Sequence, residues 1–398
     1  MIRRNFIKKT GLGVVSLCAG TSALLTSSPL FLFTGCKKNG SVVEKRRIPV
    51  IYSTDLFHPP EDPDDHYDLA MLFGLKEIEV KALIFDLATS HRSANEVGKV
   101  ALDQISKITR ELPPPWKIGL RNPLRSPDDQ ALDQPEEFQG GVELILSTLT
   151  QSKEKVVMFL VGSCRDFAVA YNRNPDLLRQ KVKAIYVNAG NGPKGMQTEW
   201  NVNLDRNAYI GLMTSGLPIY WCPCFTNFNL RLPTPSEVTA GKAFCTYFIV
   251  PNQAGLLASA QPMVKNYFTY ALSRSVEEPL GFLDKEVQAL PESNRNMWCT
   301  GPFLHAAGKK IYQTGARRWR SYTPEKAKEL GIEDPVVEVF CFEPVHITSV
   351  WQDVNGSLIP EFVNDTNTGP ASIQVFRYTH PDFNAIMPSV LAGILETL

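Results

Sequence analysis

The sequence predicts an α/β protein with a mainly parallel, open central sheet flanked by helices. From Ile48 to Thr226, short apolar runs typical of strands alternate with segments of helical periodicity. Strict alternation of strand and helix favours a parallel sheet with helices on both faces. The chain has 398 residues and a hydrophobic content of 43%, enough for one large core. Because no shift in composition marks a second domain, we expect a single domain over residues 48–398.

The charge of the chain is balanced. It contains 41 basic and 41 acidic residues, so its formal net charge is zero. Nucleic-acid-binding domains normally carry a basic excess, and this composition therefore argues against a nucleic-acid partner. No run of like charge is long enough to form an interaction tail.

The first 36 residues have the features of an export signal. Arg3 and Arg4 form a twin-arginine pattern, and an uncharged stretch follows from Thr10 to Gly35. That stretch ends at Cys36 in the sequence LFTGC, which is similar to a lipobox.

We predict a twin-arginine-type lipoprotein signal over residues 1–36, with a lipid attached to Cys36 as the membrane anchor. A short polar linker over residues 37–47 would join it to the domain. An uncleaved N-terminal transmembrane anchor is the alternative interpretation. Either one places the domain in the bacterial cell envelope, as a periplasmic protein or a membrane-anchored lipoprotein.

The first half of the domain contains six strand-like runs and four helical patterns in alternation. The predicted strands are Pro49–Thr54, Val80–Asp86, Trp116–Leu120, Val156–Gly162, Ala184–Asn188 and Pro218–Cys222. The predicted helices are Ala94–Arg110, Gly141–Leu149, Arg165–Asn172 and Arg206–Ser215.

Beyond Thr226 the alternation is less regular. Helices are expected at Ser236–Ala243 and Gln261–Ser273, and a final strand and helix at Ile373–Tyr378 and Asp382–Leu398. Three further runs predict a small antiparallel unit near the C-terminus, with Asn355-Gly356 as a hairpin turn between the last two. These runs are Val336–Phe342, His346–Gln352 and Leu358–Val363.

After Asp65, the apolar spacing of Leu69, Ala70, Leu72 and Phe73 predicts a further helix. Four carboxylates lie between the first strand and this helix: Asp55, Asp62, Asp64 and Asp65. The carboxyl edge of a parallel sheet is where α/β proteins place their ligands. Clustered negative charges repel one another unless protons or a cation hold them together, and a hard divalent cation prefers oxygen ligands. The segment therefore favours a metal site, and the alternative is a solvated acidic turn that caps the helix.

A second polar segment, Glu199–Asp205, follows the fifth predicted strand through a glycine-rich loop that contains Asn191. Glu199 and Asn201 offer acceptors and donors that suit the vicinal hydroxyls of a sugar. The alternative is an ordered loop that caps the next helix through Asp205.

Cysteines and histidines give weaker signals. The six cysteines after Cys36 lack disulfide or zinc spacing and are expected to be buried free thiols. His66 would either join the site or sit at the start of the helix, and His305 is expected in the core or a pocket wall. Trp200 and Trp298 would either stack on a nucleobase or pack in the core.

In this order, the segments resemble the inosine–uridine-preferring nucleoside hydrolase family. The matching motifs are Thr54-Asp55, the Asp62-Pro63-Asp64-Asp65 loop, the turn at Val161–Ala168, Glu199-Trp200-Asn201, and Asp205–Ala208. The last strand and helix also resemble the end of that family. Order and spacing match over most of residues 48–398.

The resemblance implies a Ca²⁺-dependent hydrolase fold. Asp55 would be a calcium ligand and the base for a water molecule, Asp65 a bidentate ligand, and the carbonyl of Val161 a further ligand. Ribose hydroxyls would bind to four residues, Asp64, Asn191, Glu199 and Asn201.

The chain departs from the family pattern in three places. Residues 56–61 lengthen the loop after Asp55 and add His58. An asparagine expected after the second strand is missing, and Asp86 or His91 is the candidate for its space. The acid and the calcium-binding aspartate expected near the C-terminus are also missing from Met297–Pro302, where Glu292, Asn294 and Asn296 are the nearest candidates.

These observations predict a calcium-dependent hydrolase of the N-glycosidic bond of ribonucleosides or related N-ribosides. Two alternatives stay open, a hydrolase of another sugar-derived glycoside and a non-catalytic surface lipoprotein that binds a sugar or nucleoside. The resemblance also implies a homo-oligomer, although no segment of the sequence indicates an interface.

Overall fold

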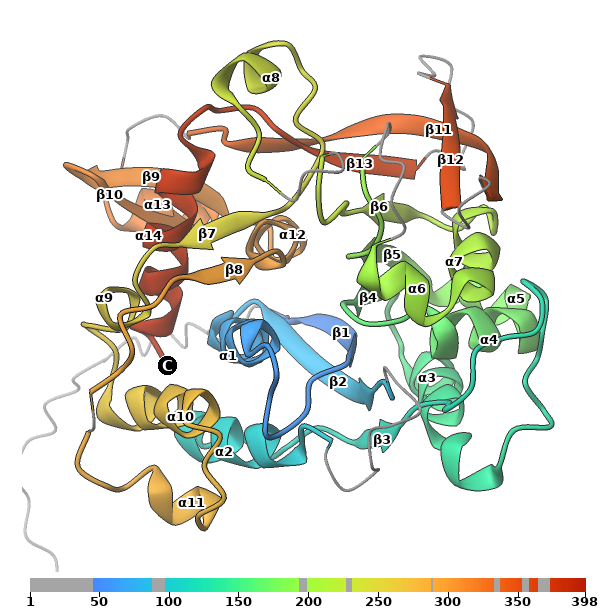
Figure 1. Cartoon of the computed structure of the whole chain (residues 1–398), viewed down its shortest axis with the longest axis horizontal. Helices are drawn as coiled ribbons and strands as arrows, with labels where there is room; N and C mark the ends of the chain where they lie inside the picture. The colour runs from blue at the N-terminus through green and yellow to red at the C-terminus, as the bar shows by residue number, and fades with distance from the viewer. Residues whose placement is uncertain are drawn as a thin grey trace, which may run out of the picture. The chain divides into compact units, whose positions relative to one another are not determined.

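A sheet of nine strands forms the middle layer of the described chain in this computed structural model (Figure 1). The structure describes residues 46–87, 97–192, 199–226, 231–287, 289–332, 337–352, 358–363 and 373–398, all within one compact unit. The order of the strands is β12-β11-β13-β6-β5-β4-β1-β2-β3. Their bounds are β1 Ile48–Thr54, β2 Ile78–Phe85, β3 Trp116–Ile118, β4 Val156–Leu160, β5 Val182–Val187, β6 Ile219–Trp221, β11 Phe340–Gln352, β12 Leu358–Val363 and β13 Ile373–Tyr378.

Seven of these strands pair in parallel with their neighbours: β13, β6, β5, β4, β1, β2 and β3. The other two extend the sheet beyond β13, where β11 pairs antiparallel with both β13 and β12. All six strands predicted before Thr226 are present, so the predicted α/β class with a mainly parallel sheet is confirmed. Two short strand pairs lie outside this sheet: β7 (Phe248–Val250) with β8 (Arg295–Met297), and β9 (Lys310–Gly315) with β10 (Arg318–Tyr322).

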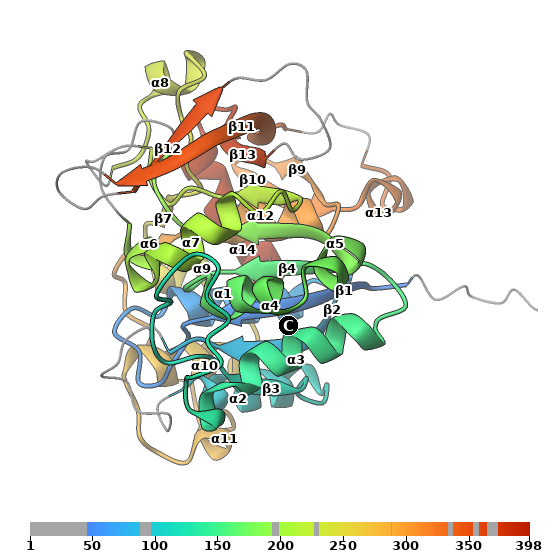
Figure 2. The same ribbon diagram turned by 90° about the vertical axis from the view of Figure 1, so that its right-hand side faces the viewer.

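Helices cover both faces of the sheet. Figure 2 shows α3, α4 and α5 across one face, and in Figure 1 α1, α10, α12 and α14 lie on the other side. The described helices are α1 Asp64–Gly74, α2 Lys99–Thr109, α3 Gly140–Gln151, α4 Arg165–Arg173, α5 Pro175–Lys181, α6 Trp200–Leu204, α7 Arg206–Met213, α8 Pro235–Thr239, α9 Gln253–Leu256, α10 Pro262–Leu272, α11 Pro279–Phe282, α12 Thr300–Ala306, α13 Pro324–Glu329 and α14 Phe383–Leu395, with a 3₁₀ helix at Glu136–Phe138.

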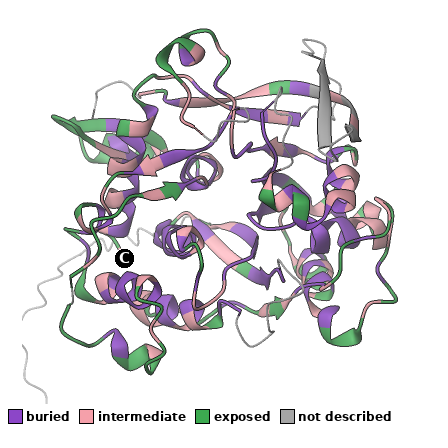
Figure 3. Ribbon diagram, in the orientation of Figure 1, coloured by how far each residue is buried: buried purple, intermediate pink, exposed green. Residues whose placement is uncertain are grey.

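The side chains of the central strands pack into two separate hydrophobic cores. In β1, Val50 and Tyr52 pack into one apolar cluster, whereas Ile51 packs into the other. Side chains of a strand alternate between the faces of its sheet, and a strand that is covered on both faces is apolar at every position. This is why β1 is apolar from Ile48 to Tyr52 and buried from its second residue onward (Figure 3).

The C-terminal strands differ from the prediction. The runs predicted as Val336–Phe342 and His346–Gln352 form one strand, β11, which begins at Phe340. Its first half pairs with β13, and its pairing with β12 begins at His346. Pro344 lacks an N–H, but at this position β11 is paired on one side only, because its pairing with β12 begins at His346. A proline is tolerated in a strand where one side is unpaired. The antiparallel hairpin is therefore an extension of the main sheet.

Some predicted features lie outside the described residues: the signal with Cys36, linker residues 37–45, His91 and the Asn355-Gly356 turn. Within the described ranges, no helix combines the length and the apolar character needed to cross a membrane.

Candidate functional site

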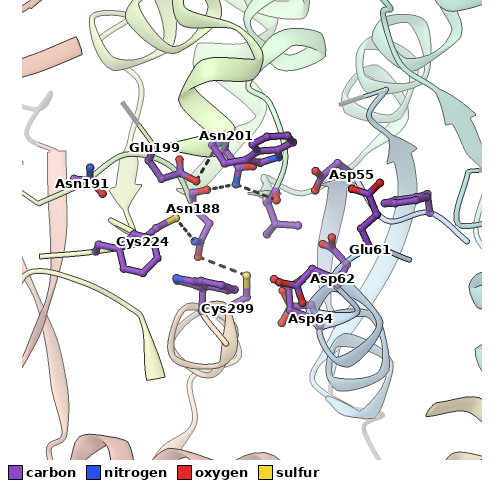
Figure 4. A pocket seen from close by; sticks show the side chains of 17 residues that line it. Asp55, Glu61, Asp62, Asp64, Asn188, Asn191, Glu199, Asn201, Cys224 and Cys299 are labelled. Carbon is purple, nitrogen blue, oxygen red and sulfur yellow. Dashed lines mark hydrogen bonds between the residues drawn. The ribbon is translucent and has the colours of Figure 1, made fainter. Parts of the chain in front are cut away.

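A pocket of about 440 Å³ lies at the carboxyl ends of β1, β4 and β5. Carboxylates from the β1–α1 loop and α1 form one wall, and amides and thiols from the segments after β5, β6 and β8 form the other (Figure 4). The lining residues are Asp55, Phe57, Glu61, Asp62, Asp64, Asp65, Asp68, Val161, Asn188, Asn191, Glu199, Trp200, Asn201, Cys224, Phe225, Trp298 and Cys299. The residues to which the resemblance assigns a catalytic, substrate-binding or metal-binding role are all among them: Asp55, Asp64, Asp65, Val161, Asn191, Glu199 and Asn201.

The acidic wall is anchored to the end of β1. Thr54 Oγ1 donates to Asp65 Oδ1 at 2.8 Å and accepts from the backbone N–H of Leu56 at 3.1 Å. The strand end thereby fixes both the start of the loop and the first turn of α1. Asp55 is 9% exposed. The longer loop therefore still leaves Asp55 in the same pocket as Asp64 and Asp65.

Burial and mutual repulsion raise the pKa values of these acids. The pKa of Asp64 and that of Asp65 lie well above their ordinary value, because both groups are buried and because neighbouring aspartates, Asp55 and Asp68 among them, add negative charge. Burial also raises the pKa of Asp68 to about 7. Such a wall holds either protons or a cation at neutral pH.

Asp62 has a different environment from its neighbours. Its Oδ1 lies 2.6 Å from a guanidinium nitrogen of Arg295, in a partly exposed ion pair at the rim of the pocket. The same guanidinium approaches Gln253, which accepts from Tyr67 of α1 at 3.1 Å. Asp62 thus connects the loop to β8.

The opposite wall is built on Asn201. Its Nδ2 donates to the carbonyl oxygen of Asn188 at 2.8 Å and to that of Val161 at 3.2 Å. The ends of β4 and β5 are therefore tied together by one amide, whose two N–H groups are both used. The side-chain oxygen of Asn201 remains as an acceptor toward a ligand.

Asn188 is held between two thiols. Its Nδ2 donates to Cys224 Sγ at 3.2 Å, and its Oδ1 accepts from Cys299 Sγ at 3.5 Å. Both cysteines are free and buried, as are three of the four other described cysteines after Cys36, while Cys341 is half-buried. The expectation of buried free thiols therefore holds for most of them, and Cys224 and Cys299 additionally line the pocket.

Glu199 begins a short helix where the sequence suggested a loop. As the N-cap of α6 it accepts from the backbone N–H groups of Asn201 and Val202, and it also accepts from Gly190. Burial raises the pKa of Glu199 to about 7, and the backbone donors oppose that shift. The predicted cap by Asp205 is also present, because Asp205 accepts from the Ala208 N–H at 3.0 Å at the start of α7.

A buried ion network supports the turn after β4. Arg165 is 1% exposed, and its Nε donates to Asp205 Oδ2 at 3.0 Å. Ser163 donates to both carboxylate oxygens of Asp86 through its backbone and its hydroxyl, at 2.7 and 2.9 Å. Asp86, a candidate for the space of the missing asparagine, therefore supports this turn and does not line the pocket.

The described histidines lie away from the pocket lining. His66 is buried in α1, and burial lowers its pKa to about 3. His58 bonds to the Ser275 carbonyl and stacks on Tyr270. His305 bonds to the Tyr186 hydroxyl at 2.7 Å, in agreement with its expected place in a core or pocket wall.

The candidates for the missing C-terminal aspartate are elsewhere. Neither Glu292 nor Asn294 lines the pocket, and Asn296 Oδ1 accepts from the Tyr247 hydroxyl at 2.8 Å. The segment contributes Trp298 and Cys299 to the lining instead. Trp298 packs against Phe225 and Tyr247, whereas Trp200 is 56% exposed at the same pocket.

Calcium is the ion that the resemblance implies, and the donor set fits it by chemistry. Among the described residues, no three His, Cys, Asp or Glu side chains converge as a formed metal site. However, Asp55, Asp65, Asp68 and Val161 line one pocket, and carboxylate and carbonyl oxygens are the ligands that Ca²⁺ prefers. One oxygen of Asp68 is buried without a hydrogen-bond partner.

Sequence reasoning missed seven lining residues: Phe57, Glu61, Asp68, Asn188, Cys224, Phe225 and Cys299. For two of them, the sequence contains a local pattern that could have indicated a place in the pocket. Asn188 is the last residue of a predicted strand, and Asp68 follows Asp64 by four positions on a predicted helix, which places both aspartates on one face. Cys224 and Cys299 reach the pocket because segments that are distant in sequence fold together, and no local sequence pattern indicates that they line it.

Searches of family models and of curated proteins find no match to this sequence. Solved structures do match. A plant nucleoside hydrolase, the PpNRh1 enzyme, superposes with a TM-score of 0.50 at 13% identity, over 88% of this chain and 98% of the other.

Two bacterial proteins give lower scores. The inosine-uridine preferring nucleoside hydrolase of Bacillus anthracis gives a TM-score of 0.48 at 11% identity, over 88% of this chain and all of the other. A purine-preferring ribonucleoside hydrolase from Gardnerella vaginalis gives 0.43 at 14% identity, over 87% and 99%.

The chain therefore has a nucleoside hydrolase-like fold, as its sequence motifs indicated. The pocket lies at the carboxyl edge of its parallel sheet, the usual ligand position in α/β proteins.

Proposed function

We propose that the protein hydrolyses the N-glycosidic bond of ribonucleosides or related N-ribosides, with Ca²⁺ as cofactor. One observation carries the proposal: a carboxylate wall containing Asp55 and Asp64 faces an amide wall containing Asn188 and Asn201 across one pocket (Figure 4), and Asp65 lines the same pocket. The nucleoside hydrolase-like fold supports it. A sugar bound between these walls would meet acids on one side and hydroxyl partners on the other.

Asp55, Asp65 and the Val161 carbonyl would hold the ion. When bound, Ca²⁺ would lower the pKa of a water molecule and orient it toward the anomeric carbon. Asp55 would accept the proton of that water, since it is the acid at the end of β1.

The other wall would hold the ribose. Asn201 has both N–H groups committed to backbone carbonyls, so its oxygen would accept a hydroxyl. Glu199 already accepts from three backbone donors and hydrogen-bonds to the Cys224 thiol, so a second hydroxyl would bind there by taking the place of one of these weaker contacts. Asp64 and Asn191 would complete the ribose contacts. These contacts would stabilise an oxocarbenium-like transition state.

Ribose release from a panel of nucleosides, together with calcium content by elemental analysis, tests the proposal. Asp55→Asn is expected to lower kcat by about 10²- to 10⁴-fold with an unchanged circular dichroism spectrum. Asp166→Asn is the matched control, because Asp166 is as buried as the pocket acids but lies outside the pocket. No ribose release from any substrate, combined with no bound calcium, would sink the proposal.

A non-catalytic sugar or nucleoside binder is the second candidate. The observation that favours it is the lining itself, since none of the described histidines reaches the pocket to protonate a leaving group. Calorimetry separates the two functions. A binder retains affinity for a nucleoside without turnover, whereas an enzyme loses turnover in Asp55→Asn.

We also propose that the domain is exported and held at the membrane through a lipid on Cys36. The sequence of residues 1–36 supports this placement. Membrane fractionation of cells that express the wild type and Cys36→Ser tests it, and equal amounts of both proteins in the membrane fraction would contradict a lipid anchor.

A further inference from the structure

Asp68 is a pocket acid that the proposed chemistry leaves without a role. It lies one turn into α1 and is 2% exposed, and it lines the pocket. Its Oδ1 is buried and has no hydrogen-bond partner among the described residues. The carboxyl group hydrogen-bonds to the Cys299 thiol, but a buried oxygen without a partner is costly, so Oδ1 is held in the folded protein at an energetic disadvantage.

The position of Asp68 on α1 directs it toward the other acids. It follows Asp64 by four residues and Asp65 by three, and residues at these spacings are neighbours on one helix face. Asp65 is already fixed by Thr54. The unpartnered oxygen therefore belongs to the same wall as the acids that would hold the ion.

The facing segment supplies no acid of its own. Cys299 lies just before α12, within Met297–Pro302, where the resemblance implied a calcium-binding aspartate. Its thiol contacts Asn188 Oδ1 at 3.5 Å and also hydrogen-bonds to the carboxyl group of Asp68. At this side of the pocket a neutral thiol therefore stands in place of a carboxylate.

We propose that Asp68 is a ligand of the cation, and that α1 thereby replaces the carboxylate missing from the C-terminal segment. The ion would then be held by Asp55, Asp65, Asp68 and the Val161 carbonyl, so that every charged ligand comes from the residue after β1 or from α1. This inference rests on the proposed cation of the site.

Titration of the full-length protein with Ca²⁺ alone, followed by isothermal calorimetry, tests the inference. Asp68→Asn is expected to raise the Kd for Ca²⁺ by about 10- to 100-fold, because calcium affinity depends on the number of charged ligands. Asp166→Asn is the matched control: its Oδ2 is also buried without a partner, and it lies outside the pocket. This control should leave the Kd unchanged within about twofold.

The outcomes separate the two proposals. If the wild type binds Ca²⁺ and Asp68→Asn binds it equally well, the role of Asp68 is overturned and the proposed function stands. If the wild type binds no Ca²⁺, the cation of the proposed function fails, and this inference fails with it.

A second variant covers the case in which Asp68→Asn does not fold. Cys299→Asp in the wild-type background adds a carboxylate at the facing segment, and tighter Ca²⁺ binding is expected if Asp68 faces the ion across that position. Unchanged or weaker binding by folded Cys299→Asp would overturn the inference.

Discussion

Arg165 shows how much a single buried residue organises near the site. Its guanidinium donates to Asp205 and to the carbonyl oxygens of Leu120 and Leu204, and it lies 3.9 Å from Asp86. These partners come from three separate segments of the chain, since Leu204 and Asp205 are neighbours in sequence. Removing the cation would leave two buried carboxylates without their counter-charge.

Arg165→Met is therefore expected to reduce the free energy of unfolding by about 3–5 kcal/mol, the usual cost of breaking a buried ion pair from one side. Urea denaturation measures the change. Arg179→Ala is the control, because Arg179 makes an exposed ion pair with Asp176 and should have little effect. Equal stability of the two variants would contradict the structural role of Arg165.

Asp166 gives a prediction about pH. Burial, and then the charge of Asp86, raises its pKa from 3.8 to about 7. Between these values the native state keeps a proton that the unfolded chain releases, so the free energy of unfolding falls as the pH rises from about 4 to 7.

Asp166→Asn should remove this contribution. The stability of the wild type relative to the variant is expected to decrease from pH 4 to pH 7 and to level off above pH 7, as measured by urea denaturation across that range. A difference that stays constant over the range would show that the carboxyl group titrates normally in the folded protein.

At the level of elements, the turn after β4 is packed tightly against the end of β1. A Cβ at Gly162 would lie 2.9 Å from Asp86 Oδ2 and 3.0 Å from the backbone nitrogen of Asp55. No side chain fits there without moving one of these groups. The glycine therefore lets the turn approach the strand end that carries the proposed base.

Gly162→Ala is expected to destabilise the protein by about 1–3 kcal/mol and to weaken Ca²⁺ binding, because it displaces Asp55. Thermal denaturation and calcium calorimetry on the same variant test both effects. Gly255→Ala serves as the control, since the nearest atom to a Cβ there is 3.5 Å away. Full calcium affinity in Gly162→Ala would contradict the coupling between the turn and Asp55.

For the whole molecule, the ion would connect the ends of β1 and β4, two neighbouring inner strands of the sheet, with the helix α1. Ca²⁺ at about 100 times its Kd should then stabilise the folded state by about 2.7 kcal/mol, with a higher Tm than in a chelator. Asp55→Asn should show a smaller increase. A Tm that does not respond to Ca²⁺ in the wild type would contradict a cation in this pocket.

Much of the fold could be predicted from local patterns. Alternating strand and helix periods gave the parallel sheet, and the position of Asp55 after an apolar run placed it at a strand end. Such signals are local because side-chain direction follows from backbone periodicity. The single strand β11 was missed, because whether Pro344 ends a strand depends on which neighbour lies beside it.

The sequence by itself determined the class of fold, the acidic loop, and the order of motifs that resembles nucleoside hydrolases. Only the tertiary structure decided which residues face one another: Asn188 between Cys224 and Cys299, Asp62 with Arg295, and Asp68 at the pocket. Cys224, Cys299 and Arg295 are far in sequence from the residues they meet. Their positions follow from how helices and strands pack against one another, and no local sequence pattern predicts that packing.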